Sequence, residues 1–545
     1  MPPARPRALA PQKPTPMPPR RISLKARSLA ALCAFALGAT SMAPVAQAQS
    51  QVSTPNSLPA LGDPEAEDFS VGTERKLGDQ IMREIRRDPD YVDDPVLLEY
   101  LQSVWQPLVA EARARGNIAA DIDPRFAWEP FLVRDPSVNA FALPGGYIGV
   151  HLGLLAITST RDELASVLAH ELSHITQRHI ARSIATSKRQ SILGLASLVL
   201  GLLAASKSRS PDAANAVIAG TQAATLQGQL NFSRDMEREA DRVGMAVMTG
   251  AGFAPGGMAA MFEKLDKGNR LNDSGGFPYL RSHPLTTERV GEARSRIGVA
   301  PVAAPVGVIE HTLAEARARV LMDTRHDALR RWQALDADQV SSTLADKLLS
   351  AYSSALASTQ LRDWARADAS IASTFALLRG APPPTARAER AVRLLQAESL
   401  LARGAAPRAA EVLQPYAAEN SRPIMLALAQ VALAPSFNAD EKTMATRASE
   451  LQTWVAVNPN DSVAWSALGQ VWTRLNRPLR ALRAEAESRA ALGDLTGAVD
   501  RFRAGQRLAR GGGNVDFIDV SVIDARLRDV EAMRKVIAAD EKAQR

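Results

Sequence analysis

A histidine, a glutamate directly after it and a second histidine four residues on from the first are the side chains best placed for chemistry. They are His170, Glu171 and His174, within the segment AHELSHITQRH. In an α-helix, residues four apart lie about 40° apart around the axis, so both imidazoles project from one face and can bind one metal ion. Glu171 can then reach a water molecule on that ion without binding the ion itself. The spacing predicts a metal site that activates water for hydrolysis.

A metal site of this kind needs a third protein ligand, which is usually a carboxylate from a later helix. The segment FSRDMEREADRVGM offers four acidic side chains, Asp235, Glu237, Glu239 and Asp241. Glu237 and Asp241 are four residues apart and share a helical face, whereas Asp235 and Glu239 lie about 160° away from Glu237. We predict that Glu237 is the third ligand and that Asp241 steadies one of the ligand histidines.

The helix that contains the two histidines is predicted to begin after Thr160. Glu163 follows three residues later, as in a capping box, and the helix is expected to continue to about Ser183. In a continuous helix of that length, His179 points about 180° away from His170. His179 is therefore expected not to share the metal.

The region before this helix changes from helical to strand-like patterning. Helical spacing extends from about Phe69 to Arg115, and the segment FAWEPFLV then predicts a strand. The segment AFALPGGYIGV predicts two short strands on either side of the turn Pro144-Gly145-Gly146. These features indicate a small sheet beside the predicted metal helix.

The first strand of that pair is also a candidate for binding substrate. Asn139, Ala140 and Phe141 are expected at its beginning. A strand at the edge of a sheet can pair with an extended peptide through main-chain hydrogen bonds, which tolerates many substrate sequences. The alternative is an ordinary hairpin strand, and the sequence leaves both open.

The first 48 residues have the composition of a secretory signal peptide. Seven basic residues and no acidic one lead into and flank the apolar stretch Leu29–Met42, and small residues follow at Ala46–Ala48. We expect cleavage after Ala48 and export to a bacterial periplasm, by the general secretory or the twin-arginine route. Met17 is an alternative start to Met1.

The remaining chain is electrically neutral and contains no cysteine. Without the seven leader charges, 58 of the 65 basic side chains remain, which equals the 58 acidic ones. This balance excludes nucleic acid as an expected partner. Because Cys33 is the only cysteine, stability must come from packing and not from disulfides.

A second apolar run, residues 192–205, contains about 14 residues, fewer than the roughly 20 that span a membrane. It is expected to form part of a helical hairpin that dips into a membrane surface or a substrate groove, or else to be a buried core helix. The protein is thus predicted to be soluble or peripherally associated with a membrane.

Residues 301–308 have the composition of a linker, and the chain beyond them is rich in Ala, Leu and Arg. Trp465, Leu468, Gly469 and Trp472 match the first half of a tetratricopeptide repeat. A turn residue followed by second-helix positions recurs in three sets: Gly493, Ala498 and Phe502; Gly404, Ala409 and Leu413; and Arg362, Ala367 and Ile371. We predict stacked helix pairs that present a surface for a partner, with a generic helical bundle as the alternative.

Four segments in this order, NAFALPGGYIGVHLGLL, HELSHITQRH, SRDMEREADRVG and SHPLTTERV, resemble zinc metallopeptidases of the HtpX and CAAX-prenyl-protease class. Within this class, the chain is similar to soluble periplasmic members that have a C-terminal tetratricopeptide domain and act on outer-membrane β-barrel assembly. The resemblance implies an α+β zincin-like metallopeptidase domain at residues 49–300. It implies an all-α solenoid of tetratricopeptide repeats at residues 309–545.

The resemblance also implies roles for individual residues. His170, His174 and Glu237 would bind one Zn²⁺ per chain, and Glu171 would be the general base. Asp241 occupies the position of the second catalytic acid of the class, through the Glu-x-x-x-Asp pattern.

Two further residues follow from the segment RSHPLTTERV. The resemblance places His283 in a loop over the active site, where it could fill the open position of zinc and keep the enzyme latent; the alternative is an ordinary loop residue. Arg289 is a candidate to stabilise the oxyanion or a substrate carboxylate, with a solvated helix residue as the alternative.

These features together predict a periplasmic zinc endopeptidase of protein quality control. Its expected substrates are misfolded or stalled proteins, outer-membrane β-barrels above all, whose assembly it would also assist. The repeat domain would dock on a client or on the assembly machinery. The alternative is a chaperone or scaffold without proteolytic activity, whose zinc site is structural and closed by four protein ligands.

Overall fold

The computed structural model describes residues 70–186, 233–271, 277–297, 308–335, 343–383, 385–511 and 516–543. The predicted signal peptide at 1–48 and the apolar run at 192–205 lie outside the described residues. The predicted linker at 301–308 does too, apart from its last residue.

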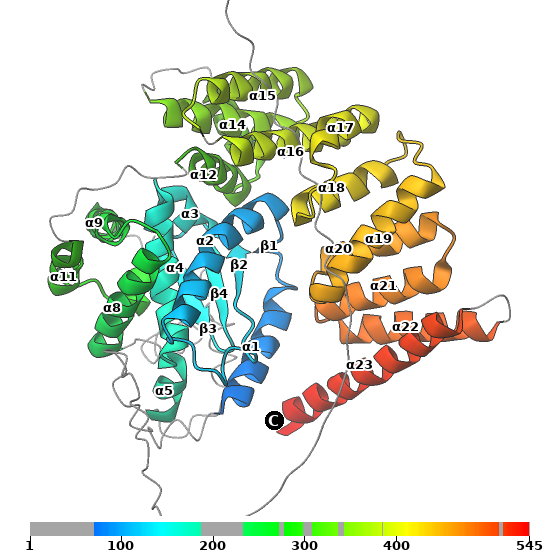
Figure 1. The fold of residues 1–545 in the computed structure, drawn as a ribbon, viewed down its shortest axis with the longest axis horizontal. Helices are drawn as coiled ribbons and strands as arrows, with labels where there is room; N and C mark the ends of the chain where they lie inside the picture. Colours follow the sequence, from blue (N-terminus) through cyan, green and yellow to red (C-terminus); the bar gives the residue numbers. More distant parts are fainter. Residues whose placement is uncertain are drawn as a thin grey trace, which may run out of the picture. The chain divides into compact units, whose positions relative to one another are not determined.

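A four-stranded mixed sheet lies at the centre of the N-terminal region (Figure 1). Its strands, in the spatial order β1-β2-β4-β3, are β1 (Tyr91–Val92), β2 (Glu129–Val133), β4 (Tyr147–His151) and β3 (Ala140–Leu143). Strand β4 pairs in parallel with β2 and antiparallel with β3, and all of its residues are buried. The predicted strands are confirmed, and β1 is an additional short strand between two helices.

Gly145 and Gly146 form the turn between β3 and β4, with φ angles of 78° and 88°. Residues other than glycine rarely adopt this left-handed region, which explains the Pro-Gly-Gly sequence of the turn.

Nine described helices belong to this region and are α1 (Val71–Ile85), α2 (Pro95–Ala114), α3 (Leu152–Ile157), α4 (Arg161–Thr176), α5 (His179–Thr186), α8 (Arg234–Gly250), α9 (Gly256–Leu271), α10 (Tyr279–Ser282) and α11 (Thr287–Ile297). Helix α4 packs against α2, α8, α9 and strand β3. Every residue of α4 from Glu163 to Thr176 is buried. The predicted metal helix is therefore the central helix of the region.

The start of α4 agrees with the prediction, but its end does not. The Thr160 hydroxyl accepts a hydrogen bond from the Glu163 N–H, while the Glu163 carboxylate accepts one from the Ser159 N–H at 2.7 Å. The predicted continuous helix to about Ser183 is wrong, because α4 ends at Thr176. Arg178 adopts a left-handed φ of 52°, which turns the chain before α5 begins.

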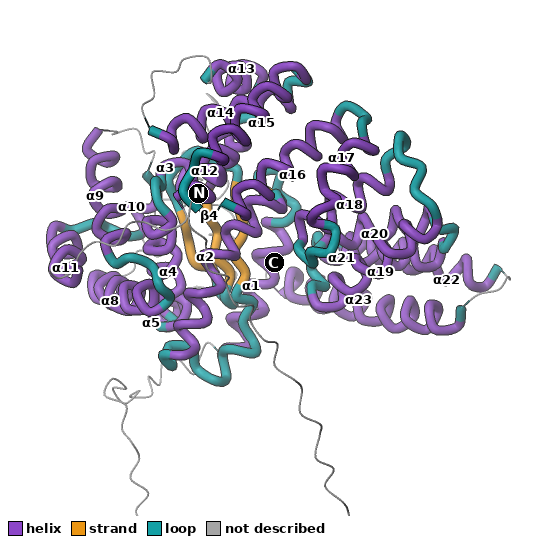
Figure 2. Tube along the Cα trace, turned by 45° about the horizontal axis from the view of Figure 1, so that its top comes forward, coloured by secondary structure: helices purple, strands orange, loops and turns teal. Residues whose placement is uncertain are grey.

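The described residues from 308 onward contain helices and loops but no strand (Figure 2). The helices are α12 (Val308–Met322), α13 (His326–Ala334), α14 (Leu344–Gln360), α15 (Trp364–Arg379), α16 (Ala386–Ala402), α17 (Ala406–Leu413), α18 (Arg422–Leu433), α19 (Glu441–Val457), α20 (Ser462–Arg474), α21 (Pro478–Ala491), α22 (Leu495–Arg510) and α23 (Phe517–Ala543), with a short 3₁₀ turn at Gln414–Tyr416. The helical character predicted for this region is thereby confirmed.

The positions singled out in the helical region have the conformation and burial that close helix pairs require. Arg362, Gly404 and Gly493 all have left-handed φ angles at the turns. The second-helix positions are buried, namely Ala367, Ile371, Ala409, Leu413, Ala498 and Phe502. Successive helices such as α14 and α15, or α20 and α21, pack directly on each other. That these pairs are tetratricopeptide repeats stays a prediction.

Helix α12 joins the two regions. It packs against α2 and α3 as well as α14, and its residues Ala314 and Ala318 belong to the apolar core of the N-terminal region. His311 on the same helix contacts the Tyr100 hydroxyl and the Thr158 carbonyl oxygen. The first helix after the predicted boundary is thus shared between both sides of it. No described helix is both long enough and apolar enough to cross a membrane.

Candidate metal centre

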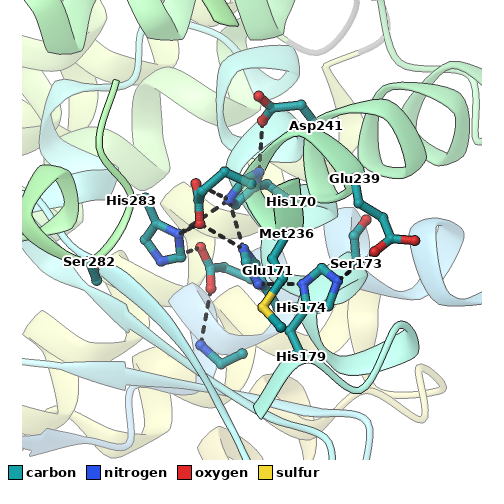
Figure 3. A network of polar contacts seen from close by, with 12 residues as sticks. His170, Glu171, Ser173, His174, His179, Met236, Glu239, Asp241, Ser282 and His283 are labelled. Carbon is teal, nitrogen blue, oxygen red and sulfur yellow. Dashed lines mark hydrogen bonds and ion pairs between the residues drawn. The ribbon is translucent and has the colours of Figure 1, made fainter. Parts of the chain in front are cut away.

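Three structural elements bring the predicted site residues together (Figure 3). Helix α4 contributes His170, Glu171 and His174, helix α8 contributes Glu237, and the loop after α10 contributes His283. Helices α4 and α8 lie close together at this point. A Cβ atom on Gly244 of α8 would lie only 3.1 Å from the backbone of Ala169, so glycine favours this close approach.

The potential ligand atoms converge on one buried point. Single atoms of His170, His174, Glu237 and His283 all lie within 4.8 Å of one another. The Nε2 atoms of the two α4 histidines are 3.0 Å apart, and each is 3.5 Å from an oxygen of Glu237. The structure thus brings together the three predicted ligands and the predicted fourth.

The donor set and its charge fit a divalent cation. Two imidazoles and a carboxylate are ligands that Zn²⁺ prefers in hydrolytic sites. The carboxylates of Glu171, Glu237 and Asp241 are buried, but Arg289 is the single guanidinium that contacts this group among the described residues. Three carboxylates against one guanidinium leave an excess of negative charge that a Zn²⁺ ion would neutralise.

The pKa shifts at the site have both directions: the pKa values of His174, Glu237 and Asp241 are lowered, whereas those of His170 and Glu171 are raised. Burial lowers the pKa of His170, but hydrogen bonds with Asp241 and Glu237 outweigh burial and raise that pKa to about 9. Burial raises the pKa of Glu171. Both upward shifts favour the more positive protonation state of the group.

Glu171 lies beside the converging ligand atoms, and one of its two carboxylate oxygens accepts a hydrogen bond from a described residue while the other does not. Its Oε2 accepts a hydrogen bond from the Ala142 N–H of β3 at 3.1 Å. Its Oε1 is buried and accepts no hydrogen bond from any described residue, with His283 Nε2 at 3.5 Å. A buried oxygen without a hydrogen bond is costly unless a ligand or water satisfies it. Oε1 is therefore placed to receive a proton from a water molecule.

Asp241 contacts the edge of His170 that faces away from the converging ligand atoms. Its Oδ1 lies 2.9 Å from Nδ1 of His170, so it fixes the imidazole with Nε2 directed to the site. Burial raises the pKa of Asp241, but hydrogen bonds from His170 and Arg289 outweigh burial and lower it. These contacts agree with the predicted steadying role of Asp241.

Arg289 is buried, with 3% exposure, so the alternative of a solvated helix residue is wrong. Its Nε and Nη2 donate to Asp241 at 2.6 and 2.9 Å, and its Nη1 lies 2.9 Å from the Pro284 carbonyl oxygen and 2.7 Å from Glu237. The guanidinium therefore holds both acids of α8 in place.

His283 is buried in the site, with 2% exposure, and is not an ordinary loop residue. Its Nδ1 lies 3.0 Å from Glu237 Oε1 and 3.3 Å from Nε2 of His170. Its ring stacks on that of Tyr279, with the ring centroids 4.7 Å apart. The loop after α10 thus covers the metal centre.

The predicted position of His179 is wrong. It does not point away from the site, because the turn at Arg178 brings its Nδ1 to 2.9 Å from Nδ1 of His174. It does not belong to the group of potential metal ligands formed by His170, His174, Glu237 and His283. Neither glycine nor proline marks the turn, so the local sequence contained no signal for it.

The predicted edge strand is confirmed as an edge among the described strands. β3 pairs only with β4 in the sheet, and Ala140 and Phe141 lie opposite Val150 and Gly149. Asn139 directly precedes the strand. Because the next residue along, Ala142, is hydrogen-bonded to Glu171, this edge lies directly beside the metal centre.

Comparison with known proteins, like the geometry, indicates a metallopeptidase site. The family model for Peptidase family M48 matches residues 99–297, which include the residues of the metal centre described above. The chain is 34% identical over 245 residues to the beta-barrel assembly-enhancing protease of Escherichia coli K12, which is 44% of this chain and 47% of that protein. It is also 34% identical over 317 residues to the counterpart from Vibrio cholerae, covering 58% of this chain and 62% of the relative.

A more distant relative is the mitochondrial metalloendopeptidase OMA1 of Arabidopsis thaliana, 36% identical over 193 residues, which cover 35% of this chain and 36% of that protein. The matched part of the chain thus spans 47% and 62% of the length of these two β-barrel assembly-enhancing proteases and 36% of the A. thaliana OMA1. The resemblance to zinc metallopeptidases is confirmed, and the chain contains a zinc metallopeptidase domain of Peptidase family M48.

Proposed function

We propose that this protein is a periplasmic zinc endopeptidase that cleaves misfolded or stalled proteins, outer-membrane β-barrels above all. One observation supports proteolysis most. The Oε1 atom of Glu171 is buried beside the three ligands, His170, His174 and Glu237, and accepts no hydrogen bond from the described residues. A purely structural metal site has no need for a base at this position. The names of the E. coli and V. cholerae relatives, β-barrel assembly-enhancing proteases, support the substrate class, and the predicted signal peptide supports the compartment.

The chain's own residues divide the reaction between them. Zn²⁺ held by His170, His174 and Glu237 would supply a Lewis acid and lower the pKa of an attacking water. Glu171 takes the proton of that water at Oε1 and returns it to the leaving amide nitrogen. The Ala142 N–H holds the other Glu171 oxygen, so the carboxylate keeps its orientation while the proton moves.

Asp241 acts behind His170 in this proposal, as the second acid of the site. It accepts from Nδ1 of His170, which keeps the metal-binding nitrogen directed inward. Arg289 holds Asp241 and Glu237. Because Arg289 already donates to these carboxylates, it would stabilise an oxyanion through its positive charge and not through a direct hydrogen bond.

We propose further that the edge of β3 that pairs with no described strand, at Asn139, Ala140 and Phe141, pairs with an extended segment of the substrate. The edge position of the strand and its contact with Glu171 support this role. Main-chain pairing would accept unfolded segments of many sequences, as a quality-control enzyme requires.

We propose that His283 keeps the site latent by lying where the water and substrate must enter. Its burial among the ligand atoms supports this role. The same observation also favours the second candidate function, a scaffold whose metal is closed by four protein ligands. Both candidates assign the helical region, as tetratricopeptide-like helix pairs, to docking on a client or on the assembly machinery.

The test is Glu171→Gln in the full chain. This variant keeps the size and polarity of the side chain but removes the base, so zinc content should be unchanged and cleavage of an unfolded substrate such as casein should fall by a factor of about 10²–10⁴. Cleavage that survives the change refutes the mechanism. In cells, the inactive variant should retain uncleaved clients, whose identification tests the proposed substrate class.

A further inference from the structure

The two histidines of α4 are held from behind in different ways. His170 contacts the carboxylate of Asp241 through Nδ1, at 2.9 Å. His174 contacts another imidazole through Nδ1, that of His179, also at 2.9 Å. The metal centre therefore has one ligand backed by an acid and one backed by a histidine.

His179 in turn contacts a carboxylate at its other nitrogen. Its Nε2 lies 3.1 Å from Oε2 of Glu239, and Arg182 Nη1 donates to the same oxygen at 3.2 Å. His174 and His179 are fully buried, whereas the Glu239 side chain is 30% exposed. A chain of contacts thus leads from the metal centre through two imidazoles to a carboxylate at the surface (Figure 3).

The hydrogens of this chain have one consistent arrangement when His174 binds metal through Nε2. The proton of His174 must then be on Nδ1, where it is donated to Nδ1 of a neutral His179. His179 must accept at that nitrogen, so its own proton is on Nε2 and is donated to Glu239. Each donor meets one acceptor, with no pair of like atoms left facing each other.

The backbone conformation of the preceding residue also holds His179 in place. Arg178 has a φ of 52°, which is uncommon for a residue with a large side chain. Its guanidinium contacts the buried carboxylate of Glu74 on α1, through Nη2 at 3.2 Å and Nε at 3.3 Å. This ion pair stabilises the turn that brings His179 back against His174.

We propose that His179, backed by Glu239, is a positioning residue that orients His174 and fixes its proton on Nδ1, so that Nε2 is available to the metal. The proposal rests on the proposed function in one respect, that His174 is a zinc ligand. It adds a second residue to Asp241 as a determinant of metal affinity. It also gives Glu239 a role as the hydrogen-bond partner of His179, although Glu239 lies on a different face of α8 from Glu237.

The test is zinc affinity of the full chain, measured by competition with a chromophoric chelator, together with the visible spectrum of the Co²⁺-substituted protein. His179→Ala should weaken zinc binding about 10-fold to 100-fold, the usual effect of losing such a partner, and should change the Co²⁺ spectrum. Glu239→Ala should have a smaller effect in the same direction, because that side chain is partly exposed. Asp235→Ala on the same helix, with a side chain that is 86% exposed, is the matched control and should bind zinc normally.

Two conservative variants separate positioning from a general loss of structure. His179→Asn places an acceptor where Nδ1 lies and should keep most of the affinity. His179→Gln places it nearer the position of Nε2 and should lose about as much affinity as His179→Ala. If the Ala, Asn and Gln variants of His179 all keep the zinc affinity and the Co²⁺ spectrum of the wild type, the proposal is overturned but the proposed function is left intact. Zinc binding that survives His174→Ala would overturn both.

Discussion

Replacing His283 with alanine should activate the enzyme if this residue keeps the site latent. In the closed site, Nδ1 of His283 lies 3.0 Å from the buried carboxylate of Glu237, and its ring stacks on Tyr279. One hydrogen bond to a charged group contributes about 1.5–3 kcal/mol. Since about 1.4 kcal/mol corresponds to a factor of ten, losing this contact should raise the open fraction about 10-fold to 100-fold where the closed state dominates.

The assay is the initial rate of cleavage of fluorescently labelled, unfolded casein, with zinc content measured on the same samples. Ser282→Ala is the matched control, because it alters the neighbouring residue, whose hydroxyl donates to the Tyr279 carbonyl oxygen, and leaves His283 in place. A rate for His283→Ala equal to that of the control, with full zinc content, would refute the latch. Loss of zinc without any gain in rate would instead favour the structural four-ligand site.

Two further predictions concern the contacts of α12 with the N-terminal region. Burial lowers the pKa of His311 to about 4 from its ordinary value of 6.5, so its contribution to stability is complete above pH 6.5 and is lost towards pH 4, by about 1.4 kcal/mol per pH unit. Urea unfolding of His311→Gln between about pH 7 and pH 5 should therefore depend less steeply on pH than that of the wild type, and an identical slope would contradict the assignment. Arg317→Met should lower the free energy of unfolding by about 3–5 kcal/mol, because it removes the charged partner of the buried Asp94. Adding Asp94→Asn should recover most of that loss in urea unfolding, whereas additive losses would show that the two residues are not coupled.

The residues of the metal centre could be predicted because their geometry is local to single helices. His170 and His174 share one face of α4, and Glu237 and Asp241 share one face of α8, so helical periodicity places the two members of each pair together. The strands around Pro144-Gly145-Gly146 could be predicted for a similar reason, since the turn residues mark where each strand ends. Pairing the two helices followed from chemistry, because a metal site of this kind needs a third protein ligand, usually a carboxylate from a later helix.

The errors arose where tertiary contacts override local patterns. The turn at Arg178 depends on Glu74, which lies more than a hundred residues away in sequence, so no pattern within α4 could place His179 against His174. The burial of Arg289 depends in the same way on its two acidic partners from α8. A charged residue in a polar helix has an exposed position as its default expectation, and only the assembled site shows otherwise.

Ion pairs link the helical region to the start of α2, the helix that packs beside the metal centre. These contacts limit how the role of the helical region can be tested. Arg317 of α12 binds Asp94, which also caps the start of α2, and Arg422 of α18 binds Asp93 at 2.6 Å. Helix α2 packs in turn on α4 and α8. Removing the helices would leave both acids without these arginines and would uncover the core that α12 covers, at a cost large enough to unfold a marginally stable domain. Lost activity in a chain that ends before α12 could therefore not be assigned to lost docking. Substitutions on exposed helix surfaces remote from α2 change docking while leaving these ion pairs intact, and they are the test that separates recognition of a client from support of the active site.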